Sequence, residues 1–260
     1  MHALKLATWN VALPVAALRR KAMRAHTDRE QADVWVLTET HDGFTPGHTF
    51  SSHSSAAGRD GRHKQEHRWV TIWSRHPFKP LDTRDKERTA AARIYPEFGA
   101  PFVVYGTVLP WAGSSWREHP SKGGDAFRWA LSMQCADWKQ LRQAHPEDEF
   151  FVLGDFNQDL VQGRPRYCGT RTNRVALETA LESAGLVALT GADGDPIRRD
   201  SFPLACIDHI CARRDSKWSA EPAVRWPDEP VPKRGLSDHF GLSMSFTLNA
   251  RSFNPSSSSD

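Results

Sequence analysis

Long apolar runs are absent from the sequence, and cysteine is scarce. No stretch approaches the ~20 apolar residues of a membrane-spanning helix. The N-terminus, MHALKLATWNVALP, has no basic leader followed by a long apolar segment, so we expect neither secretion nor a membrane span. The four cysteines form no C-x-x-C pair and lie at Cys135, Cys168, Cys206 and Cys211. We therefore expect a soluble cytoplasmic protein with reduced thiols.

A strong net charge is also missing. The formal net charge is only +3, which is too small to indicate nucleic-acid binding by itself. Basic residues cluster locally at 18–24, 58–68, 163–174 and 231–235. Clusters of this kind are typical of an ordinary solvated surface. The run at 163–174 is of more interest because it follows an acidic motif directly.

Strand-like and helix-like segments alternate along the whole chain. Apolar runs predict strands at 4–11, 33–40, 68–74, 101–109, 206–212 and 240–248. Helices are expected from Pro14 to about Arg29, over 125–142 with Asp125 as the cap, and after Asn173 as the cap up to Gly185. Segments 41–67 and 110–123 are interpreted as loops. We expect one α/β (α+β) domain over residues 1–250 and a disordered tail over 251–260.

The stretch FVLGDFNQD, residues 151–159, runs from a buried strand into acidic and amide side chains. Asp155, Asn157 and Asp159 occupy every second position. Gly, Asp and Asn are ordinary turn formers, so the cluster has a purely structural interpretation. Alternatively, the strand presents these groups at the edge of a sheet, where they hold a metal ion or orient a water molecule. Partners elsewhere in the chain are needed to decide.

Such partners recur at or near the ends of other apolar runs. They are Asn10, Glu39, Asp155, Asn157, Asp208, Asp238 and His239. One polar residue after a strand is unremarkable, but carboxylates, amides and a histidine placed in this way can converge at one edge of a pair of sheets.

Five short motifs carry a resemblance to a known family. TWN, TET, GDFNQD, IDHI and SDH occur in that order and together resemble the motif series of the endonuclease/exonuclease/phosphatase superfamily, the deoxyribonuclease I-like fold. Its members include AP endonucleases, sphingomyelinases and inositol-phosphate phosphatases. The resemblance implies a four-layer α/β/β/α sandwich, in which two packed mixed β-sheets are flanked by helices. It also implies a phosphoric ester hydrolase.

Hydrolysis of a phosphodiester needs a cation to neutralise the phosphoryl oxygens and a base to prepare the water. Glu39 offers a hard oxygen ligand of the kind that Mg²⁺ or Mn²⁺ prefers. The resemblance implies that Glu39 is the principal metal ligand, that Asn10 supports it and that Asp238 ligates a first or second ion.

The same resemblance assigns the catalytic groups. His239 is the general base or transition-state stabiliser, since its pKa lies near neutrality, and Asp208 fixes its tautomer. Asp155 orients or deprotonates the attacking water, and the Asn157 amide donates to a phosphoryl oxygen. Either Asp155 or His239 can be the formal base.

One position departs from the family pattern. Members usually place a His or Tyr that contacts the phosphate where this chain has Val108. Tyr105, Trp111, Arg117 and His119 are candidates to replace it. Trp111 and Trp116 are the tryptophans expected to contact substrate, whereas Trp138 is expected in the core. Arg171, in the basic run after the acidic motif, is a candidate phosphate contact.

Three functions remain open at this stage. The leading one is a metal-dependent phosphodiesterase that acts as a nuclease on DNA or RNA, because aromatic rings stack on bases and arginines bind phosphates. The second is a phosphatase or phosphodiesterase for a small phosphorylated molecule or a lipid head group. The third is a catalytically weakened binding module, suggested by Val108. We expect a monomer.

Overall fold

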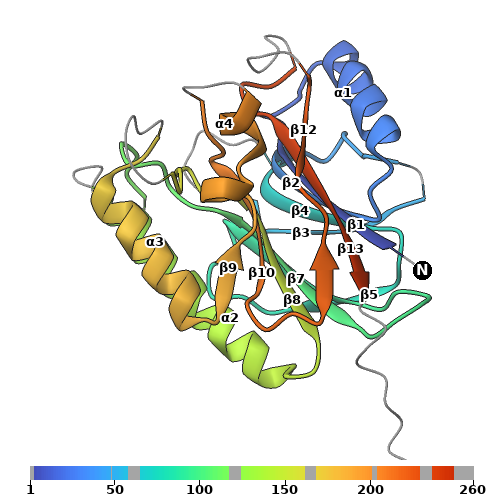
Figure 1. Ribbon diagram of the computed structural model, residues 1–260. Coiled ribbons are helices and arrows are strands. Elements are labelled where there is room, and N and C mark those ends of the chain that lie inside the picture. The colour runs from blue at the N-terminus through green and yellow to red at the C-terminus, as the bar shows by residue number, and fades with distance from the viewer. Residues whose placement is uncertain are drawn as a thin grey trace, which may run out of the picture.

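The computed structural model describes residues 3–47, 49–57, 65–116, 124–161, 168–200, 204–228 and 236–248. Within them, two β-sheets pack face to face and helices cover their outer faces (Figure 1). The expected α/β/β/α sandwich is therefore confirmed. The expected tail, residues 251–260, lies outside the described residues.

The first sheet is built around the N-terminal strand. Its order is β11 (Trp218–Ala220), β13 (Gly241–Leu248), β1 (Ala3–Asn10), β2 (Val34–His41), β4 (His67–Ser74) and β3 (Ser51–Ser54), and β12 (Val224–Trp226) also pairs with β13. Strands β1 and β2 are parallel, and the other pairs are antiparallel.

The second sheet contains the acidic motif in its middle. Its order is β5 (Phe78–Leu81), β6 (Thr89–Ile94), β7 (Phe102–Val108), β8 (Glu149–Asp155), β10 (Asp208–Arg213) and β9 (Leu186–Ala188). Only the β7–β8 pair is parallel.

Alternation along the strands fills the space between the sheets. Leu4 and Leu6 of β1 and Phe151 and Leu153 of β8 point into the same buried cluster. Every second side chain of a strand points to the same face. Thr8 and Asn10 therefore face inward like Leu4 and Leu6, and Asp155 faces inward like Phe151 and Leu153. The sandwich therefore brings polar residues from both sheets to one edge of the core.

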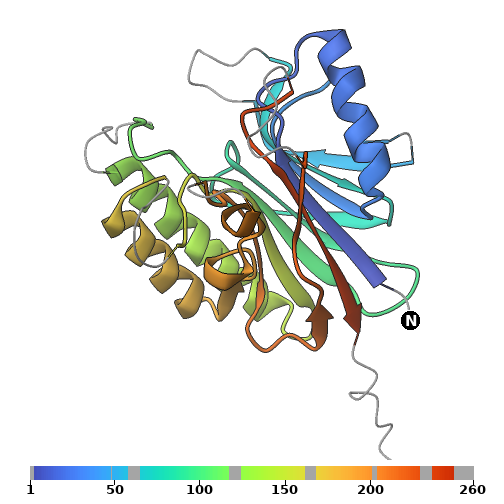
Figure 2. The same ribbon diagram turned by 45° about the horizontal axis from the view of Figure 1, so that its top comes forward.

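Helices cover the two outer faces separately. Helix α1 (Ala17–Glu30) packs through Met23 against β1 and β2, and α2 (Asp125–Ala144) and α3 (Arg171–Ser183) cover β7 and β8. Figure 2 shows α2 and α3 side by side, with α1 on the opposite side of the sheets. Trp138 of α2 is fully buried, as expected. The short elements η2 (Ala192–Gly194) and α4 (Pro196–Asp200) precede β10. None of the described helices is long and apolar enough to cross a membrane.

The expected starts of α1 and α3 were wrong, whereas α2 begins at Asp125 as expected and only its cap was assigned to the wrong residue. Helix α1 begins at Ala17 and not at Pro14, because positive φ angles at Ala12 and Leu13 turn the chain before the helix. Helix α2 has Gly124 as its N-cap, with no side-chain capping bond from Asp125.

Helix α3 is capped by Thr170 and not by Asn173. The Thr170 hydroxyl accepts a hydrogen bond from the Asn173 backbone N–H, so Asn173 supplies the donor and not the cap.

Six strands were missed, namely β3, β5, β6, β9, β11 and β12, and the first three show why. The expected loop over 41–67 contains β3, whose sequence SSHS has no apolar alternation. Strand β6 has the sequence TAAARI, in which three alanines give little strand signal although both faces are buried. Strand β5 contains Pro80, which is tolerated because β5 is at the edge of its sheet.

Gly154, which begins the GDFNQD motif, supports a close approach between β8 and β7. Its φ is +140°, and a Cβ there would lie 2.0 Å from the Thr107 carbonyl oxygen. We expect Gly154→Ala to lower the free energy of unfolding by more than about 4 kcal/mol, because strain adds to a clash with backbone that cannot move. Urea denaturation measures this change.

Gly99 is the matched control. Its φ is +103°, but nothing lies within 4 Å of the corresponding Cβ. Gly99→Ala is therefore expected to cost only about 1–2 kcal/mol of backbone strain. Equal losses for the two variants would contradict the role of Gly154 in strand packing.

Candidate active site

Asp155, the last residue of β8, lies at the centre of the site. Its side chain is 1 % exposed. Oδ1 accepts a hydrogen bond from the Asn157 backbone N–H at 2.8 Å, and Oδ2 accepts from the side-chain amides of Asn10 at 3.1 Å and Asn157 at 3.0 Å. Burial, followed by the negative charge of Asp208, raises the pKa of Asp155 to about 7.

Asn10 connects this carboxylate to the other sheet. Its amide nitrogen also donates to Oε1 of Glu39 at 3.2 Å, and its Oδ1 accepts from the Ala12 backbone N–H at 2.9 Å. Glu39 on β2 and Asp155 on β8 therefore share one donor. The expected convergence of distant acidic and amide side chains is present.

Backbone strain is concentrated beside these groups. Glu39 has a φ of +47° and Asn157 a φ of +50°, in the left-handed region that non-glycine residues seldom adopt. Ala12 and Leu13, which directly follow β1, are also in this region. Such conformations persist where surrounding contacts determine them, and they occur often at functional sites.

His239 pairs with Asp208 across the core edge. The His239 Nδ1 lies 2.6 Å from Oδ2 of Asp208. Burial by itself lowers the pKa of His239, but the charge and hydrogen bond of Asp208, together with Asp155 and Asp238, outweigh it and raise the pKa to about 10. The Asp208 carboxylate therefore stabilises the protonated form of the imidazole.

Ser237, the first residue of the SDH motif, positions this histidine. Its hydroxyl donates to the Asn10 carbonyl at 2.6 Å and accepts from the His239 backbone N–H at 3.1 Å. The Trp9 indole N–H donates to the His239 carbonyl at 3.1 Å. The polarity of Ser237 directly before Asp238 and His239 was the available signal, and the sequence interpretation missed its role.

Arg19 of α1 is a second residue that the sequence interpretation missed. Its guanidinium donates to the backbone carbonyls of Leu236, Ala12 and Val11. It therefore holds the segment after β1 against the segment that carries His239. Burial lowers the pKa of Arg19, and the negative charges of Asp238 and Glu39 oppose this shift. Arg19 is one of several basic residues in the run 18–24, and nothing in the sequence distinguishes it from its neighbours.

Within the described part of the chain, Asp155, Asp208 and His239 form a group of potential metal ligands, with one ligand atom of each within 4.8 Å of the others. This set differs from the expected ligands Asn10, Glu39 and Asp238. Asn10 and Glu39 lie directly beside it, and Asp238 is exposed next to His239. All carboxylates of the predicted site therefore lie around one cluster.

The rest of the acidic motif has a structural role. Asp159 is fully buried, forms an ion pair with Arg174 of α3, and accepts a hydrogen bond from the Cys168 backbone N–H at 2.6 Å. Asn157 donates from its side-chain nitrogen to both the Leu109 carbonyl and Asp155. In this structure Asn157 orients Asp155, and its contact with a phosphoryl oxygen stays a prediction.

The predicted substrate contacts have different outcomes. The prediction that Tyr105 contacts the substrate was wrong. Tyr105 is fully buried on the helix-covered face of β7, and its hydroxyl donates to Asp137 of α2. Trp111 is 58 % exposed in the segment after β7, and Arg171 is exposed at the start of α3. Trp116 is buried against Trp129, which contradicts its expected role as a substrate contact.

Two more of the candidate contacts, Arg117 and His119, lie outside the described residues. Val108 is 1 % exposed and pairs with Asp155 in the β7–β8 register. The position that lacks the expected donor therefore lies directly beside the central carboxylate.

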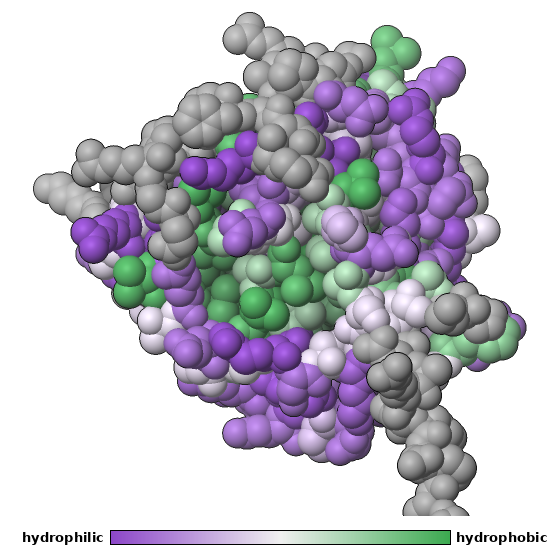
Figure 3. Space-filling model, viewed as in Figure 1, coloured by the Kyte–Doolittle hydropathy of each residue, from purple (hydrophilic) through white to green (hydrophobic). Residues whose placement is uncertain are grey.

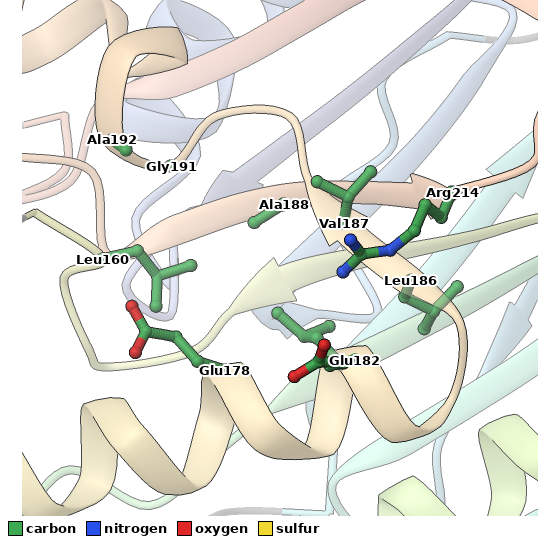
Figure 4. Close-up of a pocket in the computed structure, with 10 residues that line it drawn as sticks. Leu160, Glu178, Glu182, Leu186, Val187, Ala188, Gly191, Ala192 and Arg214 are labelled. Carbon is green, nitrogen blue, oxygen red and sulfur yellow. The ribbon is translucent and has the colours of Figure 1, made fainter.

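Two hollows differ in their relation to this site. A small one of about 20 Å³ lies beside Asp208 and His239, with an apolar lining of Ile197, Leu204, Ala205, Ile207 and Phe240. Figure 3 shows apolar side chains gathered in the middle of one face and ringed by hydrophilic residues. A groove of about 270 Å³ lies between α3 and β9 (Figure 4) and contains none of the predicted site residues.

The sequence of the chain matches the model of the Endonuclease/Exonuclease/phosphatase family over residues 7–239. The chain therefore belongs to this family of phosphoric ester hydrolases. No curated protein matches the chain.

Solved structures share the fold over almost the whole chain. The catalytic domain of human Nocturnin with bound sulfate has a TM-score of 0.66 at 15 % identity, covering 95 % of this chain and 94 % of that one. The 3′ phosphatase NExo from Neisseria, bound to a product DNA hairpin, gives 0.64 at 16 % identity, covering 94 % and 100 %. A mannosyl-6-phosphatase from Bacteroides thetaiotaomicron gives 0.63 at 14 % identity, also covering 94 % and 100 %. At these identities the likeness establishes the fold alone.

The His239–Asp208 pair predicts a measurable protonation state. Because Asp208 raises the pKa of His239, the stability that the pair contributes is present below the usual value near 6.5 and is lost as the pH rises through about 10. In EDTA, the imidazole NMR signal of His239, assigned by its loss in His239→Asn, should not titrate between about pH 6 and 8. Asp208→Asn removes the charge, so burial should then lower the pKa below its usual value.

Asp238→Asn is the matched control, because the charge of Asp238 raises the pKa of His239 less than the charge of Asp208 does. It should lower the pKa by a smaller amount. A wild-type His239 that titrates near 6.5, or an Asp208→Asn variant with an unchanged pKa, would contradict the pairing.

Proposed function

We propose that the protein is a divalent-metal-dependent phosphodiesterase that cleaves DNA or RNA. The observation that carries this proposal is the junction at Asn10, whose amide nitrogen lies 3.1 Å from Asp155 and 3.2 Å from Glu39, beside the Asp208–His239 pair. Carboxylates from two sheets are thereby placed around one point in a chain of the Endonuclease/Exonuclease/phosphatase family.

The residues present fit a hard divalent cation such as Mg²⁺ or Mn²⁺. Glu39, Asp155, Asp208 and Asp238 offer carboxylate oxygens, which these ions prefer to sulfur or imidazole ligands. The pKa of about 7 for Asp155 arises from burial among like charges, a repulsion that a cation offsets. We assign Glu39 as the principal ligand, with Asn10 in support and Asp238 on the open side. A bound ion would neutralise charge on the phosphoryl oxygens.

The protonation states distinguish the roles of Asp155 and His239. A histidine with a pKa near 10 is a poor base at neutral pH but is a strong donor to an oxygen on which negative charge develops. The Asp155 carboxylate is held by the amides of Asn10 and Asn157, in an orientation from which it can accept a proton from an attacking water. We therefore assign Asp155 as the group that accepts the proton of the attacking water and His239 as the group that stabilises the transition state.

Nucleic acid is the proposed substrate because of the segment that follows β7. Leu109 donates its backbone N–H to the Asp155 carbonyl at 2.9 Å and accepts from Asn157 at 2.9 Å, so this segment is attached to the site. Two residues later, Trp111 is more than half exposed. An exposed indole next to a phosphate site suits stacking on a base, and Arg171 offers a positive charge to the backbone.

Activity on a panel of phosphate esters tests the chemistry. With Mg²⁺ or Mn²⁺, and not with EDTA, the wild-type protein should hydrolyse bis-p-nitrophenyl phosphate and nick plasmid DNA or cut single-stranded RNA. Glu39→Gln and His239→Ala should each lower kcat by at least about 100-fold, since each removes a group that acts on charge in the transition state. Circular dichroism should show an intact fold.

Glu182→Gln is the control for this experiment, because Glu182 lies in the α3–β9 groove away from the site. It should retain wild-type turnover. Turnover by Glu39→Gln or His239→Ala at the wild-type rate would refute the assignment, and turnover on inositol phosphates alone would replace the nuclease proposal with a small-molecule phosphatase.

Trp111→Ala tests the substrate class separately. Loss of one stacking platform is worth about 1–3 kcal/mol, so KM for single-stranded DNA or RNA should rise by roughly 5-fold to 150-fold. The values for bis-p-nitrophenyl phosphate should not change. Phe98→Ala is the control, since Phe98 is equally exposed at 57 % but lies in the connection between β6 and β7 that precedes β7. Unchanged KM values for nucleic acid in Trp111→Ala would remove the support for this substrate.

A further inference from the structure

Four residues form a row across the site edge of the second sheet. Asp208 pairs with Asp155, and Asp155 pairs with Val108. Val108 in turn donates its backbone N–H to the Arg88 carbonyl at 3.0 Å. This bond continues the antiparallel β6–β7 register by one position beyond the Thr89–Thr107 pair. The strand order β6–β7–β8–β10 places these residues side by side.

The Arg88 side chain extends from the same face of the sheet as the Asp155 carboxylate. Ala90, Ala92 and Ile94 of β6 all point into the core between the sheets, so the alternation of side chains assigns position 88 to that face as well. Arg88 and Asp155 are two strands apart, about 10 Å between their backbones. Val108, a short apolar residue, occupies the strand between them.

Two tryptophans hold the guanidinium at this edge. It lies over the ring of Trp69 at 4.1 Å and over the ring of Trp116 at 5.1 Å. Trp69 belongs to β4 of the first sheet, next to Val70 and Arg68, which pair with the two neighbours of Glu39, so the guanidinium also contacts the first sheet. Stacking engages the faces of a guanidinium, whereas its hydrogen bonds to phosphate lie in the guanidinium plane.

We propose that Arg88 contacts a non-bridging phosphoryl oxygen of the substrate and supplies the donor that Val108 does not. This assignment rests on the proposed phosphate ester hydrolysis. Arg88 is only 6 % exposed, and a charge in a largely dehydrated position interacts strongly with an anion.

The inference is tested in the full chain with Arg88→Gln. In Mg²⁺, its kcat/KM for bis-p-nitrophenyl phosphate should fall by about 100-fold to 1,000-fold, the usual effect of removing one donor to a developing oxyanion. Arg88→Ala should regain part of its activity when millimolar guanidinium chloride is added. A residue with a merely structural role does not respond in this way.

Arg93→Gln is the matched control on the same strand. Arg93 bonds to Asp148 and lies over the ring of Tyr95, so this variant also loses an ion pair and a ring contact. It should lose thermal stability comparably, and its kcat/KM should stay within about twofold of the wild-type value. A similar loss of activity in Arg93→Gln, or no guanidinium rescue of Arg88→Ala, would assign the effect of Arg88 to folding.

Binding of inorganic phosphate separates this inference from the proposed function. Calorimetric titration in Mg²⁺ should show at least tenfold weaker binding to Arg88→Gln than to the wild type. If the wild type turns over substrate and Arg88→Gln matches it, the Arg88 assignment is wrong while the function stands. If the wild type is inactive but its phosphate affinity depends on Arg88, the function is wrong while the contact stands. A wild type that does not bind phosphate overturns the Arg88 assignment.

Discussion

The structure depends on one buried carboxylate, Asp155, that lies where the two sheets meet. Burial among like charges destabilises its ionised form, and three hydrogen bonds from Asn10 and Asn157 partly compensate. Asn10 belongs to the first sheet and Asp155 to the second, so the hydrogen bond from Asn10, unlike the two local ones from Asn157, forms only when the sheets are packed together. The strained conformations of Glu39 and Asn157 persist because the same contacts determine them.

Cations balance this acidic edge in two different ways. His239 is charged because Asp208 stabilises its protonated form, and Ser237 ties its backbone to the end of β1. The Arg19 guanidinium donates hydrogen bonds to three backbone carbonyls and so fixes the position of the loops around the site. The residue that fixes the loops, Arg19, is therefore distinct from the histidine that pairs with Asp208.

The sequence was informative where a side chain interrupts an apolar run. Asn10, Asp155, Asp208 and His239 were found this way, because each interrupts or adjoins a buried strand and the strand fixes its place. Tyr105 was assigned wrongly because its neighbour Val104 faces the core between the sheets, so the side chain of Tyr105 points to the other face, toward α2. Arg88 precedes an alanine-rich strand that gave no signal, so its pairing with Val108 was visible only in the sheet order.

Val108 was the reason to consider a weakened, non-catalytic protein, and the sheet geometry argues against that interpretation. On one face of a sheet, side chains of neighbouring strands extend into the same space, so a long side chain can cover the place of a short one beside it. Valine at position 108 removes a donor and is short, and Arg88, in the turn directly before β6, has a side chain long enough to extend over it. On the Arg88 proposal, the donor comes from the neighbouring segment, where the guanidinium lies over the rings of Trp69 and Trp116. The departure from the family pattern is then a relocation of the phosphate contact and not its loss.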